Sequence, residues 1–323
     1  MRTVIVRTPY RISFFGGGTD HPEWFTHNRG AVLSTAIDKY SYLMGRLVPS
    51  YGGPPFRIRY SKIEETYNVR SIRHRAVRET LKHFTFDQPI TITHDGDLPS
   101  RSGVGSSSSF VVGLSHLLSR LRDHAISPKI LAQTAIRIER DRCKECVGFQ
   151  DHIAAAYGGL NFIRFYGKQS FSISPQTVPP TFFDHILLLY TGIQRNGPLL
   201  EAKKIRNITS NGHVLEKLQK MVETGIGFLK SADWEGFGEL LHESWALKRS
   251  LSHSVSSPLI DDWYNTARKH NAWGGKLIGS GGGGFLLLFA SPSDHDEIKA
   301  SLPALTPIPV AIDSEGSKII YEE

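Results

Sequence analysis

A glycine- and serine-rich run, residues 102–109, most constrains what this chain can fold into. It holds two glycines and five serines, and lies between a strand-like segment, residues 89–94, and an apolar helix-like segment, residues 110–118. Glycines let a backbone approach a ligand closely, and a helix N-terminus attracts anions. The run therefore predicts a phosphate-binding loop. A flexible linker is the alternative, which the periodic apolar segments on both sides disfavour.

Composition limits the class of protein. The 323 residues are 40% hydrophobic and 21% charged, which is typical of a globular chain of about two domains. The apolar runs are far shorter than the roughly 20 residues of a membrane span, and the first residues do not resemble a signal peptide. We therefore expect a cytoplasmic protein. The net charge of +7 favours anionic partners, namely nucleotides, sugar phosphates or nucleic acid, without choosing among them.

Two other features allow both a functional and an ordinary interpretation. Cys143 and Cys146 have the spacing of half a zinc site or of a redox pair, but no second Cys/His pair matches them, which favours two ordinary thiols on a helix. Residues 69–84 predict a basic helix that is either a nucleic-acid patch or a solvated face. The second interpretation is favoured because no aromatic side chains are interleaved.

Glycine also clusters near both ends of the chain. Residues 16–18 precede Thr19 and Asp20, and residues 274–284 lead into a strand at 285–290. The chain contains neither a Walker A sequence nor an early dinucleotide-binding fingerprint. Strands and helices mix without regular alternation, which predicts an α+β fold. Three prolines within residues 175–180 predict a boundary between an N-terminal domain, 1–178, and a C-terminal domain, 179–323.

The residues offer a candidate for each role in phosphoryl transfer. That chemistry needs a phosphate cradle, a metal held by hydroxyl and carboxylate groups, a group near the nucleophile and a cation for the developing charge. The loop can supply the cradle, and one serine of 106–108 with Glu139 the metal site. Asp151 or Asp20 can lie near the nucleophile, and Arg11 can supply the cation. Spacing alone does not show that these residues converge.

The three glycine-rich segments resemble the three motifs of the GHMP kinases, the superfamily of galactokinase, homoserine kinase, mevalonate kinase and phosphomevalonate kinase. Residues 9–20, 98–108 and 276–284 match the motifs in order and spacing. The resemblance implies an N-terminal domain like that of ribosomal protein S5 and a ferredoxin-like C-terminal domain. The active site would lie between the two domains, and ATP and Mg²⁺ would be the cofactors.

The resemblance also implies roles for individual residues. Asp151 would abstract or orient the substrate proton beside Arg11, and Ser107 and Glu139 would bind the metal. The residues implied to bind ATP are Ser102, Gly103, Val104, Gly105, Ser106, Ser107 and Ser108. The residues implied to bind substrate are Asp20, Gly17, Gly18, Gly148, Gly281 and Gly282.

Within the superfamily, residues 15–20, 241–248 and 274–285 resemble the heptose 7-phosphate kinase branch. That likeness implies phosphorylation of the anomeric hydroxyl of D-glycero-D-manno-heptose 7-phosphate to the 1,7-bisphosphate, toward GDP-heptose. Gly17 and Gly18 replace the Glu-His pair of galactokinase, which disfavours galactose. Arg195 and Lys203 are candidates for the substrate phosphate, and Arg101 departs from the motif with a side chain that either touches a phosphate or points to solvent.

Several alternatives stay open at this point. The chain could phosphorylate another sugar, galactose- or fucose-like, or mevalonate; it could be a basic S5-like nucleic-acid-binding protein, or a ligand sensor without catalysis. Each implied site residue has an ordinary reading: a helix cap for Asp151, a surface ion pair for Arg11, a solvated helix residue for Glu139, a turn for Asp20. Structural roles are favoured for His21, His152 and His242. We expect ATP and a sugar phosphate as partners, no nucleic acid or membrane, and a monomer or homodimer.

Overall fold

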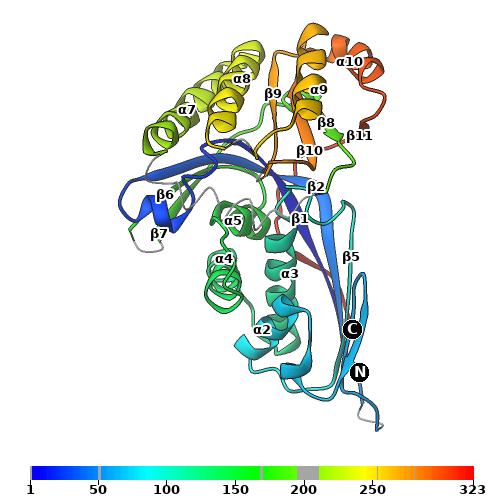
Figure 1. The fold of residues 1–323 in the computed structure, drawn as a ribbon. Coiled ribbons are helices and arrows are strands. Elements are labelled where there is room, and N and C mark those ends of the chain that lie inside the picture. The colour runs from blue at the N-terminus through cyan, green and yellow to red at the C-terminus, as the bar shows by residue number, and fades with distance from the viewer. Residues whose placement is uncertain (1, 50–51, 168–169, 195–210, 253, 280) are drawn as a thin grey trace.

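The structure is a computed structural model that describes residues 2–49, 52–167, 170–194, 211–252, 254–279 and 281–323. Within these residues the strands form two sheets (Figure 1). The larger sheet has the order β12-β1-β2-β5-β3-β4, with β6 on β2 and β7 on β6. Its strands are β1 (Thr3–Phe15), β2 (Gly30–Leu47), β3 (Phe56–Arg59), β4 (Ile63–Thr66), β5 (Ile90–Gly96), β6 (Leu160–Tyr166), β7 (Ser170–Pro175) and β12 (Lys318–Glu322).

Two long antiparallel strands, β1 and β2, form the centre of this sheet. They pair from Thr3 opposite Arg46 to Phe15 opposite Leu33. The register shifts between Pro9 and Tyr10, because proline lacks the N–H that a regular ladder would use there. The irregularity leaves residues 38 and 39 of β2 without partners on β1, and β1 continues through it to Phe15, next to the glycines at 16–18. Arg11 therefore lies within β1, just beyond the bulge.

Helices cover one face of the larger sheet (Figure 1). The apolar faces of α3 and α5 pack on β1, and α2 and α4 pack against α3. The helix α3 begins at Ser106, inside the predicted loop and earlier than the sequence-based range of 110–118, so the serines at 106–108 occupy its first turn. The bounds are α1 (Pro22–Phe25), α2 (Arg75–His83), α3 (Ser106–Leu121), α4 (Pro128–Ile136) and α5 (Gln150–Tyr157).

The second sheet has the order β11-β8-β10-β9, and four further helices accompany it within the described part of the chain. Its strands are β8 (Ile186–Tyr190), β9 (Gly274–Leu277), β10 (Phe285–Phe289) and β11 (Thr306–Ile308). The helices are α7 (Gly212–Ser231), α8 (Trp234–Ser250), α9 (Pro258–Lys269) and α10 (His295–Ser301). Sheets and helices thus occur in both halves, and the predicted α+β class is confirmed. Across the described ranges, no helix combines the length and apolar character that a membrane crossing requires.

The last strand does not stay with the second half of the chain. β12 pairs antiparallel with β1, with Val4 opposite Glu322 and Arg7 opposite Lys318. The ladder covers the outer edge of β1 and brings the two ends of the chain side by side (Figure 1). The division into an N-terminal domain, 1–178, and a C-terminal domain, 179–323, stays a prediction. Residues 318–322 belong to the N-terminal sheet.

A cluster of aromatic rings joins the two halves. Phe237 of α8 lies with its ring centroid 5.5 Å from that of Phe14 and 5.1 Å from that of Phe15, both on β1. It also lies 5.3 Å from Phe182 and 5.0 Å from Phe289 of β10. All five rings are fully buried. One side chain of the second half therefore contacts the strand that leads directly to Arg11 and the first glycine segment.

Phe237→Ala should lower the free energy of unfolding by about 3–5 kcal/mol, because it opens a cavity at this junction. Denaturant unfolding followed by tryptophan fluorescence measures the change. Ile63→Ala is the control: Ile63 is 72% exposed on β4, and its replacement should change stability by about 0.5 kcal/mol or less. Equal effects of the two substitutions would show that the cluster does not join the halves.

Candidate active site

A single cavity of about 1020 Å³ brings the three glycine-rich segments together. Gly17 and Gly18 line it from the first segment, Gly103 and Gly105 from the second, and Gly279 from the third. Residues of α8 and β9 complete the wall on the side of the second sheet. The sequence identified the three glycine-rich segments but did not show that they meet. The structure shows that all three line one cavity.

The second and third glycine segments touch backbone to backbone. Gly103 has a φ of +88°, and a Cβ there would lie 2.6 Å from the carbonyl oxygen of Ile278. A Cβ on Gly279 would lie 2.3 Å from the Cα of Gly103. Side chains at either position would separate the segments, so these glycines are needed for the close approach. The third glycine-rich segment, residues 274–284, therefore packs against the predicted phosphate-binding loop at 102–109 and supports it.

Not every residue of the loop faces the cavity. Gly103, Gly105, Ser106, Ser107 and Ser108 line it. Ser102 is buried beneath the loop, where its hydroxyl donates to the carbonyl oxygen of Pro99 at 2.6 Å. Val104 is also buried, and its carbonyl oxygen accepts a hydrogen bond from the Arg11 backbone N–H at 3.0 Å. Ser102 and Val104 therefore shape the loop through the side away from the cavity.

Gly281 and Gly282, two of the predicted substrate-binding residues, lie against another segment. The N–H of Gly282 donates to the carbonyl oxygen of Val255 at 2.9 Å, and a Cβ on Gly281 would lie 2.7 Å from the same oxygen. Neither residue is among the cavity-lining residues, whereas Gly279 is. The geometry gives these two glycines a packing role, and their role in substrate binding stays a prediction.

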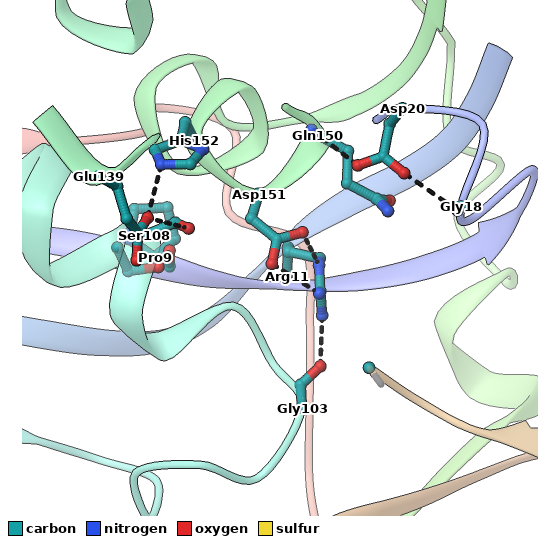
Figure 2. Close-up of polar contacts among 12 residues, drawn as sticks. Pro9, Arg11, Gly18, Asp20, Gly103, Ser108, Glu139, Gln150, Asp151 and His152 are labelled. Carbon is teal, nitrogen blue, oxygen red and sulfur yellow. Dashed lines mark hydrogen bonds and ion pairs between the residues drawn. The ribbon is translucent and has the colours of Figure 1, made fainter. Parts of the chain in front are cut away.

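Arg11 and Asp151 form a two-pronged ion pair at the centre of the site (Figure 2). Nε of Arg11 donates to Oδ1 of Asp151 at 2.7 Å, and Nη2 donates to Oδ2 at 2.8 Å. The remaining Nη1 donates to the carbonyl oxygen of Gly103 at 2.5 Å. Arg11 is only 5% exposed, so this is not a surface ion pair. Asp151 lies in the first turn of α5, after the cap residue Phe149, so it is not a helix cap.

The environment of Asp151 shifts its acidity. Burial raises the pKa of Asp151 above its ordinary value, and the nearby charge of Asp20 raises it further. The Arg11 guanidinium opposes this rise through its charge and hydrogen bonds without cancelling it. A carboxylate with a raised pKa accepts a proton more readily than an ordinary aspartate.

Asp20 lies buried beside this pair and is fixed by backbone groups (Figure 2). Its Oδ1 accepts from the N–H of Gly18 at 3.0 Å, and its Oδ2 accepts from the N–H of Gln150 at 3.3 Å. A Cβ on Gly148 would lie 1.9 Å from Oδ2. Gly148 therefore leaves the room that Asp20 occupies, and both residues line the cavity.

Glu139 lies on the other side of Asp151, on the π-helical segment Arg137–Arg142, where it contacts the loop serines (Figure 2). It accepts hydrogen bonds from the hydroxyls of Ser107 and Ser108, the latter at 2.8 Å, and its Oε2 lies 2.6 Å from Nε2 of His152. Burial alone would raise the pKa of Glu139, but the contacts with His152 and the serines outweigh it and hold the pKa below its ordinary value. Glu139 is thus an ionised, buried carboxylate and not a solvated helix residue.

Some of the histidines and cysteines noted in the sequence line the cavity, and others lie outside its lining. His152 is fully buried against Glu139, a contact for which the sequence carries no signal. His242 lies outside the cavity lining and pairs with the hydroxyl of Tyr264 at 2.7 Å. Cys143 and Cys146 both have free thiols at the cavity wall. His21 also lines the cavity.

The cations predicted for other roles are placed as follows. Arg101 lines the cavity with a φ of +60° and an exposed side chain, while Arg195 and Lys203 lie outside the described residues. In the basic helix α2, Arg78 and Lys82 pair with Glu79, which leaves less free positive charge than the sequence indicated.

Sequence reasoning missed part of the cavity wall. Ser13, Gln150, Lys248 and Lys276 line the cavity together with an aromatic group, Tyr60, His74, His94 and Phe110. Lys276 donates to the carbonyl oxygen of Phe14 at 2.6 Å, which joins β9 to the end of β1. Gln150 directly precedes Asp151, and Ser13 lies two residues after Arg11. Their closeness in sequence to Asp151 and Arg11 was the signal by which Gln150 and Ser13 could have been found.

Comparison with known proteins identifies the family. The model of the GHMP kinases N terminal domain matches residues 71–159, and that of the GHMP kinases C terminal matches residues 226–307. The chain is 27% identical to D-glycero-alpha-D-manno-heptose 7-phosphate kinase of Campylobacter jejuni over 93% of each chain. It is 23% identical to galactokinase of Pyrococcus furiosus, over 93% of this chain and 91% of that protein.

Solved structures share the fold. The D-glycero-D-manno-heptose 1-phosphate kinase from Bacteroides thetaiotaomicron superposes with a TM-score of 0.81 at 18% identity, covering 98% of this chain and 99% of that one. Lactococcus lactis galactokinase, solved with galactose, superposes with a TM-score of 0.78 at 16% identity, covering 98% and 95%. Both halves of the two-domain fold are thus matched, and the two family models together span more than half of the residues. The chain belongs to the GHMP kinases, a family of ATP-dependent phosphotransferases that act on alcohol groups.

Proposed function

We propose that this protein is an ATP- and Mg²⁺-dependent kinase that phosphorylates the anomeric hydroxyl of a sugar phosphate. The proposed acceptor is D-glycero-D-manno-heptose 7-phosphate, and the product is the 1,7-bisphosphate. The observation that carries this proposal is the Arg11–Asp151 pair, bonded to Gly103 of the glycine loop at the wall of one cavity. A proton acceptor, a cation and a phosphate cradle are thereby in direct contact. The protein would act in the cytoplasm as a monomer or homodimer.

The glycine loop and the start of α3 would bind the phosphates of ATP. Gly105 precedes α3 in a left-handed conformation, and Ser106 to Ser108 form the first turn of this 16-residue helix. The unpaired N–H groups and the positive end of the helix dipole favour an anion there. Arg101 lines the same part of the cavity and can add positive charge.

The residues beside the loop fit a magnesium ion. Mg²⁺ prefers oxygen ligands and is commonly held by one or two carboxylates together with substrate phosphates. The ionised carboxylate of Glu139 and the hydroxyl of Ser107 are such donors and already touch one another. No group of three or more acidic, His or Cys side chains suitable for a metal occurs in the part of the chain that the structure describes. When bound, magnesium would neutralise charge on the transferred phosphoryl group.

Asp151 and Arg11 would carry out the chemical step. Asp151 accepts the proton of the acceptor hydroxyl as its oxygen attacks the γ-phosphorus, while the bond from that phosphorus to the β–γ bridging oxygen breaks. Arg11 holds both carboxylate oxygens of Asp151 and offsets negative charge near the reaction centre. The raised pKa of Asp151 favours this proton transfer.

The choice of acceptor is supported by similarity and by charge. The Campylobacter relative is named for a heptose 7-phosphate, whereas galactokinase and mevalonate kinases match at 23–26% identity. Gly17 and Gly18 stand where galactokinase has Glu and His. Lys248 and Lys276 line the cavity from the second half of the chain and suit an acceptor that already carries a phosphate.

An ATP-consumption screen tests the proposal. The acceptors are D-glycero-D-manno-heptose 7-phosphate, mannose 6-phosphate, galactose, fucose and mevalonate, with products identified by ³¹P NMR. We expect the highest kcat/KM for the heptose phosphate and a new phosphorus signal at its anomeric position. A higher kcat/KM for galactose, fucose or mevalonate would contradict the proposed acceptor. Salt-sensitive RNA binding without any phosphoryl transfer would support the nucleic-acid alternative.

Asp151→Asn should reduce kcat by about 10²–10⁴-fold, because the amide cannot accept the hydroxyl proton. Binding of ATP, measured by titration calorimetry, should change little, since the loop and Glu139 remain. Asp123→Asn is the matched control: Asp123 is an 80% exposed partner of Arg2 and does not line the cavity. Wild-type turnover in Asp151→Asn would exclude Asp151 as the base.

Glu139→Gln should lower the free energy of unfolding near neutral pH. The gap in this free energy between the wild type and the variant should become smaller in acid. The folded pKa of Glu139 is lowered, so its stabilising contribution is present above its unfolded value of about 4.5 and is lost as the pH falls through the folded value. Urea unfolding from pH 6 down to the lowest pH at which the protein folds measures this gap. Glu65→Gln, at an exposed position of β4, is the control and should change stability little. A gap for Glu139→Gln that widens in acid contradicts the lowered pKa.

A further inference from the structure

Two buried polar atoms in the cavity wall have no hydrogen-bond partner within the described residues. They are Oγ of Ser13 and Oε1 of Gln150. Ser13 is 6% exposed and Gln150 is 7% exposed, and both residues line the cavity. Leaving a buried polar atom unpaired costs free energy, so native proteins rarely do so without a reason. Two such atoms in one wall point to a ligand that pairs with them.

Both side chains reach the same place, although they come from different elements. Ser13 lies on β1 and Gln150 at the start of α5. A Cβ on Gly17 would lie 3.6 Å from Oγ of Ser13 and 3.9 Å from Nε2 of Gln150. The two side chains thus flank Gly17, where the absence of a side chain leaves space. We call Ser13, Gly17, Asp20 and Gln150 the Ser13–Gln150 corner.

This corner adjoins both carboxylates of the site. The backbone N–H of Gln150 donates to Asp20, and the next residue in the chain is Asp151. Figure 2 shows the side chain of Gln150 between those of Asp20 and Asp151. A ligand group in the corner would therefore lie beside the group that reacts at Asp151.

The polar atoms of the corner match hydroxyl groups better than an anion. Oε1 of Gln150 and the carboxylate of Asp20 accept hydrogen bonds, Nε2 of Gln150 donates them, and Oγ of Ser13 can do either. A hydroxyl can donate a hydrogen bond to Oε1 of Gln150 or to Oγ of Ser13, and it can also accept one from a donor of the corner. A phosphate has no such hydrogen at its ionised oxygens, and the negative charge of Asp20 would repel it.

We propose that Ser13 and Gln150 are specificity-determining residues that bind hydroxyl groups of the acceptor next to the one that is phosphorylated. This inference rests on the proposed function only in that the acceptor is a polyol. The phosphate of a sugar phosphate points away from the corner, and its adjacent ring hydroxyls point into it. A site that hydrogen-bonds a substrate hydroxyl also rejects analogues that lack it, because its own buried groups then stay unpaired.

The test measures KM and stability for Ser13→Ala and Gln150→Leu. Each variant should raise KM for the acceptor about tenfold, which corresponds to one lost hydrogen bond, and leave KM for ATP unchanged. Neither should lower the melting temperature, since each removes a polar atom that has no partner in the described structure. A merely structural role for these side chains would instead lower the melting temperature without a selective rise in KM.

Ser115→Ala is a matched control. Ser115 of α3 is fully buried, and its hydroxyl also has no partner within the described residues, but it does not line the cavity. Its replacement should leave both KM values unchanged. A rise in the acceptor KM as large as that of Ser13→Ala would mean that the loss of a buried hydroxyl anywhere has this effect, and would overturn the inference.

The assays use the acceptor of the preceding screen that the wild type phosphorylates best, which separates the two proposals. If that acceptor is mevalonate or galactose, the heptose proposal fails, and the corner is then tested on that acceptor. An unchanged acceptor KM in both variants overturns the corner while the proposed function stands. If the wild type phosphorylates none of the acceptors, both proposals are overturned.

Discussion

The contact of Arg11 with both Asp151 and Gly103 is the interaction on which the rest of the site depends. An arginine in the middle of a buried sheet is costly unless its charge is paired and its donors are used. Here one guanidinium holds the carboxylate of α5 and a carbonyl of the phosphate loop at the same time. Its rigid, planar fork fixes the angle between the two partners, which a lysine could not do. The distance from the loop to the proposed base is therefore set by a single side chain.

That arrangement explains why the chain combines distant segments into one cavity. Gly103 can meet Arg11 only because the loop also packs directly on the backbone at Ile278 and Gly279. The loop is thus held from β1 on one side and from the third glycine segment on the other. The Phe237 cluster fixes β1 against the second half of the chain, so apolar packing outside the cavity lining helps determine how closely these backbones approach. Interior packing and polar geometry support one another here.

Much of the fold and part of the site could be predicted from the sequence. The apolar pattern identified the strands β5 and β10 closely and the later part of the helix α3, because these elements have a clear apolar face or core. The pairing of residues 318–322 with β1 was not predicted, since strand pairing over the whole chain length leaves no local signal. The likeness to a family indicated Arg11, Asp20, Glu139 and Asp151. No pattern revealed the partners Gly103 and His152, because they depend on tertiary contacts.

Several places where local rules are broken lie at the same wall of the cavity. Gly148 lacks the side chain that would collide with Asp20. The pKa of Asp151 is raised although Arg11 is bonded to it. Ser13 and Gln150 each bury a polar atom that has no hydrogen-bond partner in the described chain. Each of these features costs stability in the protein alone. A hydroxylated ligand would supply hydrogen bonds to the unpaired atoms of Ser13 and Gln150. Proton transfer to Asp151 would neutralise the carboxylate charge that burial disfavours. Forming these interactions with a ligand would therefore contribute free energy to binding and to the reaction. For this reason an acceptor rich in hydroxyl groups suits this wall better than a second nucleotide or an RNA backbone.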